Sequence, residues 1–273
     1  MKRWTAVRVR RPRDRAAIVS ALFELGAEGV QETDDEIITH LHDADRSNID
    51  GALRRVDPTA AIGFDETPDV DWSSAWRSRI GAHSVGPLVV TPPWLAERYP
   101  AETRVIIDPG MAFGTGEHET TRGVLRLLAR FLRTGDTVAD LGAGSAILSI
   151  AAARLGASRA VAIELDPEAI GNAQENIDRN EVAGRVHLLE GDATMLLPLV
   201  APVRVVVANI ISSVLLTLLP TIAAALSPGG FAILSGILAE ERSSIEKAIG
   251  DGGWRVLAFD EEGMWWSVAI ARS

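Results

Sequence analysis

Two short stretches of the 273-residue chain combine residue types that bind small ligands. Gly142 and Gly144 lie in the sequence ADLGAGSA, between two apolar segments. A glycine turn between a strand and a helix lets the backbone approach a ligand and exposes the unpaired N–H groups of the helix N-terminus. Glu164 follows 22 residues after Gly142, where a carboxylate can accept both hydroxyls of an adenosine ribose. The pair predicts a nucleoside site, with a surface acid at a strand end as the alternative for Glu164.

A regular alternation of strand and helix patterns from residue 119 onward must position these residues. Five strands are predicted here, at residues 137–141, 160–164, 186–190, 203–208 and 230–236. Helices in most of the gaps indicate a parallel sheet covered on both faces. Two further strands, 254–259 and 264–270, are joined by four turn-forming residues, too few for a crossover helix. They predict an antiparallel hairpin, and hence a seven-stranded Rossmann-like α/β sheet with a reversed last strand.

The glycine loop and the sheet together narrow the choice of cofactor. The loop has the sequence GAGSAI, which lacks the last glycine of a dinucleotide-binding motif. A phosphate-binding P-loop needs a lysine next to its glycines, and both lysines of the chain, Lys2 and Lys247, are far from the loop in the sequence, so a P-loop is excluded. A glycine loop, a strand-end acid and a reversed last strand are typical of S-adenosylmethionine methyltransferases. Asp192, after the third strand, lies where an acid can meet the adenine amino group, or it is an ordinary turn residue. Asp166 and Pro167 read as a helix N-cap and first turn.

The first quarter of the chain has a different pattern. Strand and helix signals follow the order β-α-β-β-α-β, typical of a small α+β, ferredoxin-like sandwich over residues 1–66. Residues 67–103 contain repeated prolines and tryptophans and read as a semi-rigid linker, and residues 104–273 read as the larger domain. His40 and His42 share one face of a strand, but no third ligand is in view, so we predict no metal site.

Charge is unevenly distributed along the chain. The 27 basic and 37 acidic residues give a net charge of −10, and residues 16–70 alone carry 3 − 13 = −10. This surplus argues against nucleic-acid binding, which needs Lys and Arg at phosphates, and favours a basic protein partner. Residues 205–226 contain no charged residue but several polar ones and a proline, so we expect a buried strand and helix rather than a membrane span. Cysteine is absent, and we read no signal peptide, so we expect a cytoplasmic location.

Five motifs carry a closer resemblance: DPGMAFGTGEHETT (108–121), DLGAGSAILSIAA (140–152), AIELDPEAI (162–170), VVVANII (205–211) and SGIL (235–238). With them the chain resembles the ribosomal protein L11 methyltransferases. The match runs from residue 108 nearly to the end and is looser before it. The resemblance implies an S-adenosylmethionine-dependent enzyme that N-methylates lysine side chains or the N-terminal α-amine of ribosomal protein L11. It also implies a class I methyltransferase domain and a small N-terminal domain that recognises the ribosomal protein.

The resemblance further implies roles for individual residues. It implies cofactor contacts at Thr121, Gly142, Glu164 and Asn209, with residues Phe113, Gly114, Thr115 and Gly116 forming a loop over the cofactor. Gly144 of the glycine turn and Asp192 after the third strand are expected to contact the cofactor because of their positions. Ala146 departs from the family pattern, since it replaces a glycine of the cofactor loop.

Methyl transfer to an amine needs a neutral, well-aligned nitrogen rather than a covalent nucleophile. Asn209 leaves the fourth strand at the carboxyl edge of the sheet, so its carbonyl, or the next backbone carbonyl, can accept an N–H from the amine. We therefore predict Asn209 as the catalytic residue. His118 reads either as a base or as a structural hydrogen-bonding residue.

Two alternatives remain open. One is a methyltransferase of the same fold acting on another protein, a nucleic acid or a small molecule, although the N-P-P-[YF] tetrapeptide of base and glutamine methylators is absent at Asn209. The other is a non-catalytic S-adenosylmethionine-binding module, which Ala146 alone supports.

Overall fold

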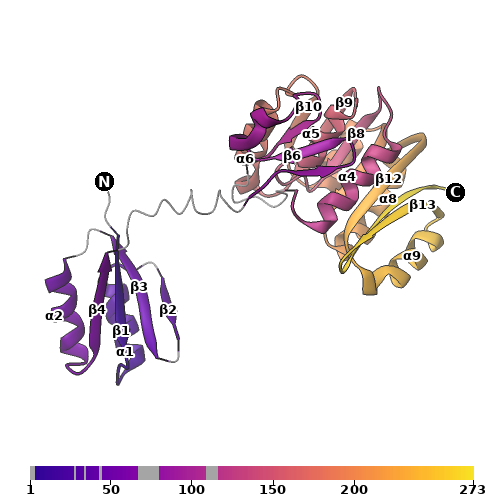
Figure 1. Ribbon diagram of the computed structural model, residues 1–273. Helices are drawn as coiled ribbons and strands as arrows, with labels where there is room; N and C mark the ends of the chain where they lie inside the picture. Colours follow the sequence, from indigo (N-terminus) through magenta and orange to yellow (C-terminus); the bar gives the residue numbers. More distant parts are fainter. Residues whose placement is uncertain (1–3, 28, 34, 43–44, 67–79, 109–115) are drawn as a thin grey trace. The chain divides into compact units, whose positions relative to one another are not determined.

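Apolar side chains gather into separate cores in two units of the chain, residues 1–79 and 80–273. The computed structural model (Figure 1) describes residues 4–273 apart from 28, 34, 43–44, 67–79 and 109–115.

The first unit is a four-stranded sheet with two helices. Its elements follow the predicted β-α-β-β-α-β order: β1 (Trp4–Arg10), α1 (Arg15–Glu24), β2 (Val30–Glu32), β3 (Glu36–His42), α2 (Arg46–Val56) and β4 (Ala61–Glu66). The antiparallel strands pair in the order β2-β3-β1-β4. Ile18 of α1 and Leu53 of α2 are fully buried in one cluster with Val7, Val9 and Ile37 of the sheet, so both helices cover the same face. Period-two alternation along β1, with Val7 and Val9 inward and Arg8 and Arg10 outward, is what fixes that face.

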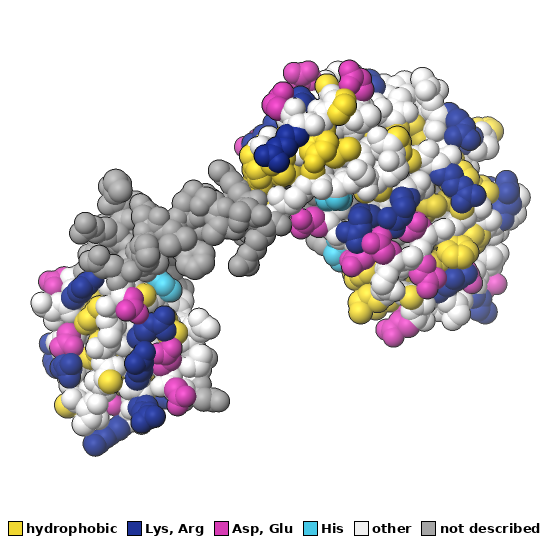
Figure 2. Space-filling view, in the orientation of Figure 1, with side chains coloured by type: hydrophobic (Ala, Val, Ile, Leu, Met, Phe, Trp, Pro, Cys, Tyr) yellow, Lys and Arg dark blue, Asp and Glu magenta, His cyan; other side chains and the backbone are white. Residues whose placement is uncertain are grey.

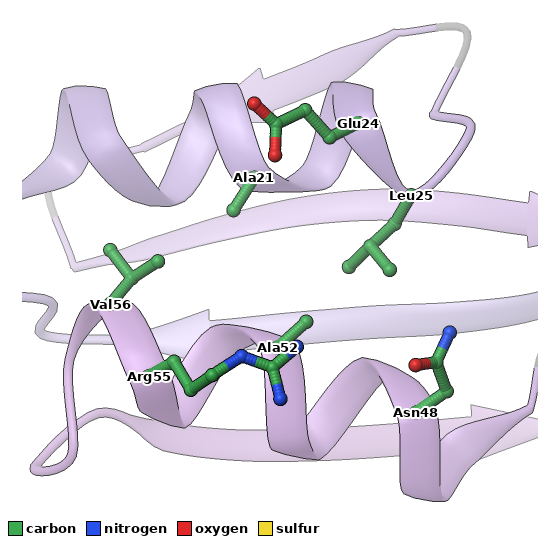
Figure 3. A pocket seen from close by; sticks show the side chains of 7 residues that line it. All are labelled: Ala21, Glu24, Leu25, Asn48, Ala52, Arg55 and Val56. Carbon is green, nitrogen blue, oxygen red and sulfur yellow. The ribbon is translucent and has the colours of Figure 1, made fainter.

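A shallow groove of about 330 Å³ separates the two helices of this unit. Figure 3 shows Ala21 of α1 and Ala52 of α2 directed toward the gap between the helices. The small size of both side chains leaves the space open. Glu24 and Arg55 contribute one charge of each sign, so the lining has no net charge.

The second unit is built on a sheet of seven strands. Its strands are β8 (Thr137–Leu141), β9 (Arg159–Glu164), β10 (Val186–Glu190), β11 (Val203–Asn209), β12 (Leu226–Leu238), β13 (Trp254–Glu262) and β14 (Trp265–Arg272). They pair in the order β10-β9-β8-β11-β12-β14-β13. The first five are mutually parallel, and β14 is antiparallel to both of its neighbours. The predicted edge hairpin and the reversed last strand are confirmed (Figure 1).

Helices cover both faces of this sheet. The helices are α4 (Glu119–Phe131), α5 (Ile147–Arg154), α6 (Pro167–Arg179), α7 (Ala193–Val200), α8 (Ser212–Ala225) and α9 (Arg242–Asp251), with a short 3₁₀ turn η2 (Ala239–Glu241). One apolar cluster joins α4, α5 and α6 to one face, and a second joins α7, α8 and α9 to the other. The inner strands β8, β9, β11 and β14 are almost fully buried, as the continuous apolar runs predict, whereas the edge strands β10 and β13 are partly exposed. Residues 205–226 form most of β11 and α8, and no helix in the described residues is long and apolar enough to cross a membrane.

The linker predicted over residues 67–103 differs in the structure. Residues 67–79 lie outside the described residues, and residues 80–103 belong to the second unit. A small sheet forms there from β5 (His83–Val85), β6 (Leu88–Thr91) and β7 (Arg104–Ile106), with a 3₁₀ helix, η1 (Pro93–Arg98), between the last two strands. Val85, Val90 and Val105 are buried in the same cluster as α4 and α5. The proline-rich stretch is therefore part of the packed unit that holds the candidate site.

Candidate functional site

Residues 142–146, here called the glycine loop, connect β8 to α5 at the carboxyl end of the sheet. The Gly142 N–H donates to the Ile163 carbonyl of β9 at 2.9 Å, which ties the loop to the neighbouring strand. Gly142 has a φ of +70°, and a Cβ there would lie 2.5 Å from Cγ2 of Ile210. Glycine is required at this position by both the backbone conformation and the space.

Ala146 ends the glycine loop in a conformation that favours glycine. Its φ is +63°, its side chain is fully buried, and it takes the N-cap position of α5 without a side-chain hydrogen bond. A left-handed alanine costs about 1 kcal/mol relative to the ordinary helical region. Alanine in place of glycine therefore keeps the left-handed backbone conformation of this position, at the cost of local backbone strain.

Glu164 lies against the glycine loop at the end of β9. Its carboxylate is 9% exposed and accepts from the Gly144 N–H at 2.7 Å and from the Asp166 N–H at 2.8 Å. The structure thus brings together Gly142, Gly144 and Glu164. Asp166 caps α6 by accepting from the Glu168 N–H, and Pro167 opens that helix, as predicted.

Asp140, which the sequence reasoning missed as a site residue, is a fully buried carboxylate below the glycine loop. Its Oδ2 accepts from the N–H and the hydroxyl of Ser149 on α5, while its Oδ1 has no hydrogen-bond partner. The pKa of Asp140 is raised to about 7, chiefly by burial and also by the negative charge of Glu164, against the lowering by the two hydrogen bonds from Ser149. An acidic residue inside an otherwise apolar strand was the available signal.

Asn209 and Thr121 meet although 88 residues separate them in the chain. The Asn209 amide, at the end of β11, donates to the hydroxyl of Thr121 on the first turn of α4 at 3.4 Å. Ser235 is the register partner of Asn209 on β12, and its hydroxyl donates to the Thr120 carbonyl at 3.3 Å. A second buried hydroxyl, from Ser267 on β14, lies 2.7 Å from that of Ser235. This chain of contacts fixes the start of α4 over the ends of β11 and β12.

His118 is the N-cap of α4. Its Nδ1 accepts from the Thr120 N–H at 3.3 Å, and its ring meets the Trp265 ring edge-on with centroids 5.1 Å apart. The structure therefore gives His118 a capping role, the second of its two predicted readings. The Gly116 carbonyl accepts from His83 Nε2 at 2.7 Å. Phe113, Gly114 and Thr115, predicted to cover the cofactor, lie outside the described residues.

Two further positions lie at the same edge of the sheet. Asp192 is the N-cap of α7, and its carboxylate accepts from both the N–H and the hydroxyl of Thr194, which lowers its pKa. Its side chain therefore has a capping role, and contact with a cofactor stays a prediction. Leu165, missed by the sequence reasoning, follows Glu164 directly and is 66% exposed. A large exposed apolar side chain next to Glu164 is of the kind on which a nucleobase can pack.

An ion-pair network connects α4 to the C-terminal hairpin. Arg126 contacts Asp260 at 2.5 Å and Glu262 at 2.6 Å, and Arg122 contacts Glu262 at 2.5 Å. The pKa of Arg126 is raised, chiefly by Asp260, and that of Glu262 is lowered, chiefly by Arg122. Figure 2 shows basic and acidic side chains next to one another on this face. The network holds the helix that carries Thr121 against β13 and β14.

The residues at this edge suit a cationic nucleoside better than a phosphate or a metal ion. Glu164 and Asp140 are the acids next to the glycine loop, and the orphaned Oδ1 of Asp140 is a buried acceptor. Among the described residues, no group of three or more His, Cys, Asp or Glu could hold a metal. A sulfonium nucleoside such as S-adenosylmethionine, with two ribose hydroxyls and positive charge, fits these donors and acceptors.

Comparison with known proteins agrees with this geometry. Residues 31–273 match the family described as ribosomal protein L11 methyltransferase (PrmA). The chain is similar to the ribosomal protein L11 methyltransferase of Thermus thermophilus, with 38% identity over 93% of this chain and 94% of that protein. It is 43% identical to the protein of the same name from Pelotomaculum thermopropionicum, over 78% of this chain and 69% of the relative. A crystal structure of a ribosomal protein L11 methylase from Lactobacillus delbrueckii superposes with a TM-score of 0.63 at 30% identity, covering 71% of this chain and 99% of that one.

Proposed function

Because the chain belongs to the ribosomal protein L11 methyltransferase family, we propose that it transfers methyl groups from S-adenosylmethionine to amino groups of ribosomal protein L11. The acceptors in this proposal are lysine side chains or the N-terminal α-amine. One observation carries it: Asn209, bonded to Thr121, lies at the same edge of the sheet as the glycine loop and Glu164. In this proposal the Asn209 amide lies beside the nucleoside site, and methyl transfer to an amine needs no covalent nucleophile.

Binding of the cofactor would rest on the groups around the glycine loop. Glu164 would accept the ribose hydroxyls, with its orientation kept by the Gly144 and Asp166 N–H groups. Gly142 leaves room for close backbone approach. When bound, S-adenosylmethionine supplies an electrophilic methyl group on a sulfonium.

Asn209 would hold the acceptor amine in line with that methyl group. The amine must be neutral, and a lysine side chain has an ordinary pKa of about 10.4. Since the Asn209 amide nitrogen donates to Thr121, its carbonyl oxygen is the atom left to accept an N–H from the amine. Accepting one N–H favours the orientation in which the nitrogen lone pair points at the methyl carbon. Alignment of this kind contributes up to roughly 7–11 kcal/mol in favourable intramolecular reactions.

The test is methylation of purified ribosomal protein L11 with methyl-labelled S-adenosylmethionine. We expect label in L11, and with Asn209→Ala a loss of about 100-fold in kcat with a smaller change in cofactor affinity. Gln174→Ala removes an exposed amide on α6, remote from the site, and is the matched control. Label only in rRNA or a metabolite extract would show a different acceptor. Binding without transfer to any fraction would indicate a binding module, and unchanged kinetics in Asn209→Ala would remove the catalytic role of that residue.

Recognition of the ribosomal protein is assigned in this proposal to the first unit. The unit as a whole carries 12 − 15 = −3, with its bases concentrated in residues 1–15 and its acids in residues 16–70, which carry 3 − 13 = −10. Exposed carboxylates of the acidic part include Glu24, Asp35, Asp45 and Asp65. A basic protein would be attracted by this field, so its association rate should fall as ionic strength rises from about 0.01 to 0.15 M. Stopped-flow association rates that do not depend on salt would contradict this assignment.

A further inference from the structure

Asn176, in the middle of α6, is completely buried and bridges two segments that are remote in the chain. Its Oδ1 accepts from the Asp108 N–H at 2.9 Å, and its Nδ2 donates to the Ser145 carbonyl at 3.2 Å. A third contact, from Nδ2 to Asn172 Oδ1 at 3.2 Å, fixes the orientation of the amide. One side chain thus satisfies an N–H after β7 and a carbonyl in the glycine loop.

The contact with Ser145 matters because that residue belongs to the glycine loop. Glu164 holds this loop from one side, at the Gly144 N–H, and Asn176 holds it through the next carbonyl. Glu164 ends β9 and Asn176 lies on α6, which follows directly. A single strand and helix therefore set the position of both peptide groups. Ser145 is only 1% exposed, so water does not replace the amide there.

Asn180, one turn further along α6, provides a natural comparison. It is also fully buried, and its amide exchanges two hydrogen bonds with the backbone of Ile106, at 2.9 Å to the N–H and 2.6 Å to the carbonyl. Like Asn176, it bonds backbone groups in or next to β7 that a neighbouring strand would otherwise bond. Unlike Asn176, it makes no hydrogen bond to the glycine loop.

We propose that Asn176 is a positioning residue for S-adenosylmethionine, which holds the glycine loop in its binding conformation through the Ser145 carbonyl. This inference rests on the proposed function and adds a residue outside the predicted site. Removing the amide deletes its hydrogen bonds to the Asp108 N–H and to the Ser145 carbonyl in a buried place, and the loss of the second bond lets the peptides of the loop turn. The backbone that approaches the cofactor is displaced, although no cofactor contact of Asn176 itself is lost.

The first experiment measures binding of S-adenosylmethionine alone, by calorimetry, to the full chain and to Asn176→Ala and Asn180→Ala. Each variant deletes a buried amide from the same helix, so we expect similar losses of stability in urea. Only Asn176→Ala should bind the cofactor more weakly, by about tenfold, since only it releases the glycine loop. In turnover, its KM for the cofactor should rise while kcat at saturation changes little. Equal affinities for the two variants would overturn the inference.

A second variant keeps the experiment decisive if Asn176→Ala does not fold. Asn176→Asp retains an acceptor for the Asp108 N–H but places an oxygen opposite the Ser145 carbonyl. That oxygen can donate only when the carboxyl is protonated, with Arg179, 3.5 Å from Oδ1, favouring the charged form. The affinity ratio of wild type to Asn176→Asp should therefore shrink as the pH falls toward 5. A ratio of one at every pH would overturn the inference.

The two proposals fail in different ways. Absence of S-adenosylmethionine binding by the unmodified chain would overturn the proposed function. Binding by the unmodified chain, with affinities unchanged in both Asn176 variants, would overturn the positioning role alone.

Discussion

Gly123 allows α4 to lie unusually close to β14, and replacing it with alanine tests how firmly the start of this helix is placed. A Cβ at position 123 would lie 2.4 Å from the Ser267 hydroxyl, 3.1 Å from Ser267 Cβ and 3.3 Å from Asp260 Oδ1. Ser267 is 2% exposed and already engaged with Ser235, so it has no free direction to turn. Gly123→Ala must therefore push α4 away or break the pair of hydroxyls.

The size of the effect follows from two opposing contributions. Replacing a helical glycine with alanine stabilises by about 1 kcal/mol where the side chain has room. Overpacking a buried contact costs about 1–3 kcal/mol, and loss of the Ser235 to Ser267 bond adds about 1 kcal/mol. The net change expected is a loss of about 1–3 kcal/mol in the free energy of unfolding. Because Thr121 moves with α4, cofactor affinity should fall as well.

Gly171, on α6, is the matched control. It is exposed, and nothing lies within 4 Å of a Cβ there, so Gly171→Ala should raise the free energy of unfolding by about 1 kcal/mol. Urea unfolding of the two variants measures the difference directly. Adding Ser267→Ala to Gly123→Ala removes the 2.4 Å contact and leaves the 3.1 Å one, so part of the loss should be recovered as a positive coupling in the double-mutant cycle. If Gly123→Ala stabilises the protein as Gly171→Ala does, the close placement of α4 on β14 is refuted.

Three other perturbations have defined outcomes. Because the pKa of Asp140 is raised from 3.8 to about 7, the folded chain holds a proton between these pH values that the unfolded chain loses. The contribution of this proton to the free energy of unfolding should fall by about 3 kcal/mol between pH 4 and 7, and the fall should be absent in Asp140→Asn. Arg126→Met removes the ion pairs with Asp260 and Glu262, which are partly exposed, and should cost about 1 kcal/mol in urea unfolding at low salt and less in 1 M NaCl. Gly142→Ala should abolish measurable cofactor binding in calorimetry, and retained affinity would show that position 142, like position 146, can accept a left-handed alanine.

Most of the second unit could be predicted because the inner strands of its seven-stranded sheet are buried on both faces. Continuous apolar runs such as that of β11 leave no other placement, and the short connection between β13 and β14 leaves no room for a helix. The small sheet of β5, β6 and β7 could not be predicted in this way. Its strands are only three or four residues long and hold their place through pairing and through α6 side chains such as Asn180. Single side-chain contacts of this kind produce no periodic pattern in the sequence, so they cannot be predicted from it.

The candidate site was predicted in its residues but not in its contacts. Gly142, Gly144 and Glu164 follow from the spacing of a glycine turn and a strand-end acid, and the structure brings them together. The resemblance, not the spacing, pointed to Thr121, and its contact with Asn209 has no local signal. Asn176 was passed over because a buried polar residue in a helix is read as surface until its partners are known.

The C-terminal hairpin has a closer connection to the site than its position at the sheet edge suggests. The candidate site has two parts. Glu164 ends β9, and the glycine loop is bonded by Asn176 of α6, whereas Thr121 lies on α4. The position of α4 is in turn set by β14, through Ser267, and by the acids of β13. The hydrogen bond from Asn209 to Thr121 is the point at which these two halves meet, at 3.4 Å. A change in the hairpin should therefore alter the alignment of the acceptor amine before it alters cofactor binding through the glycine loop.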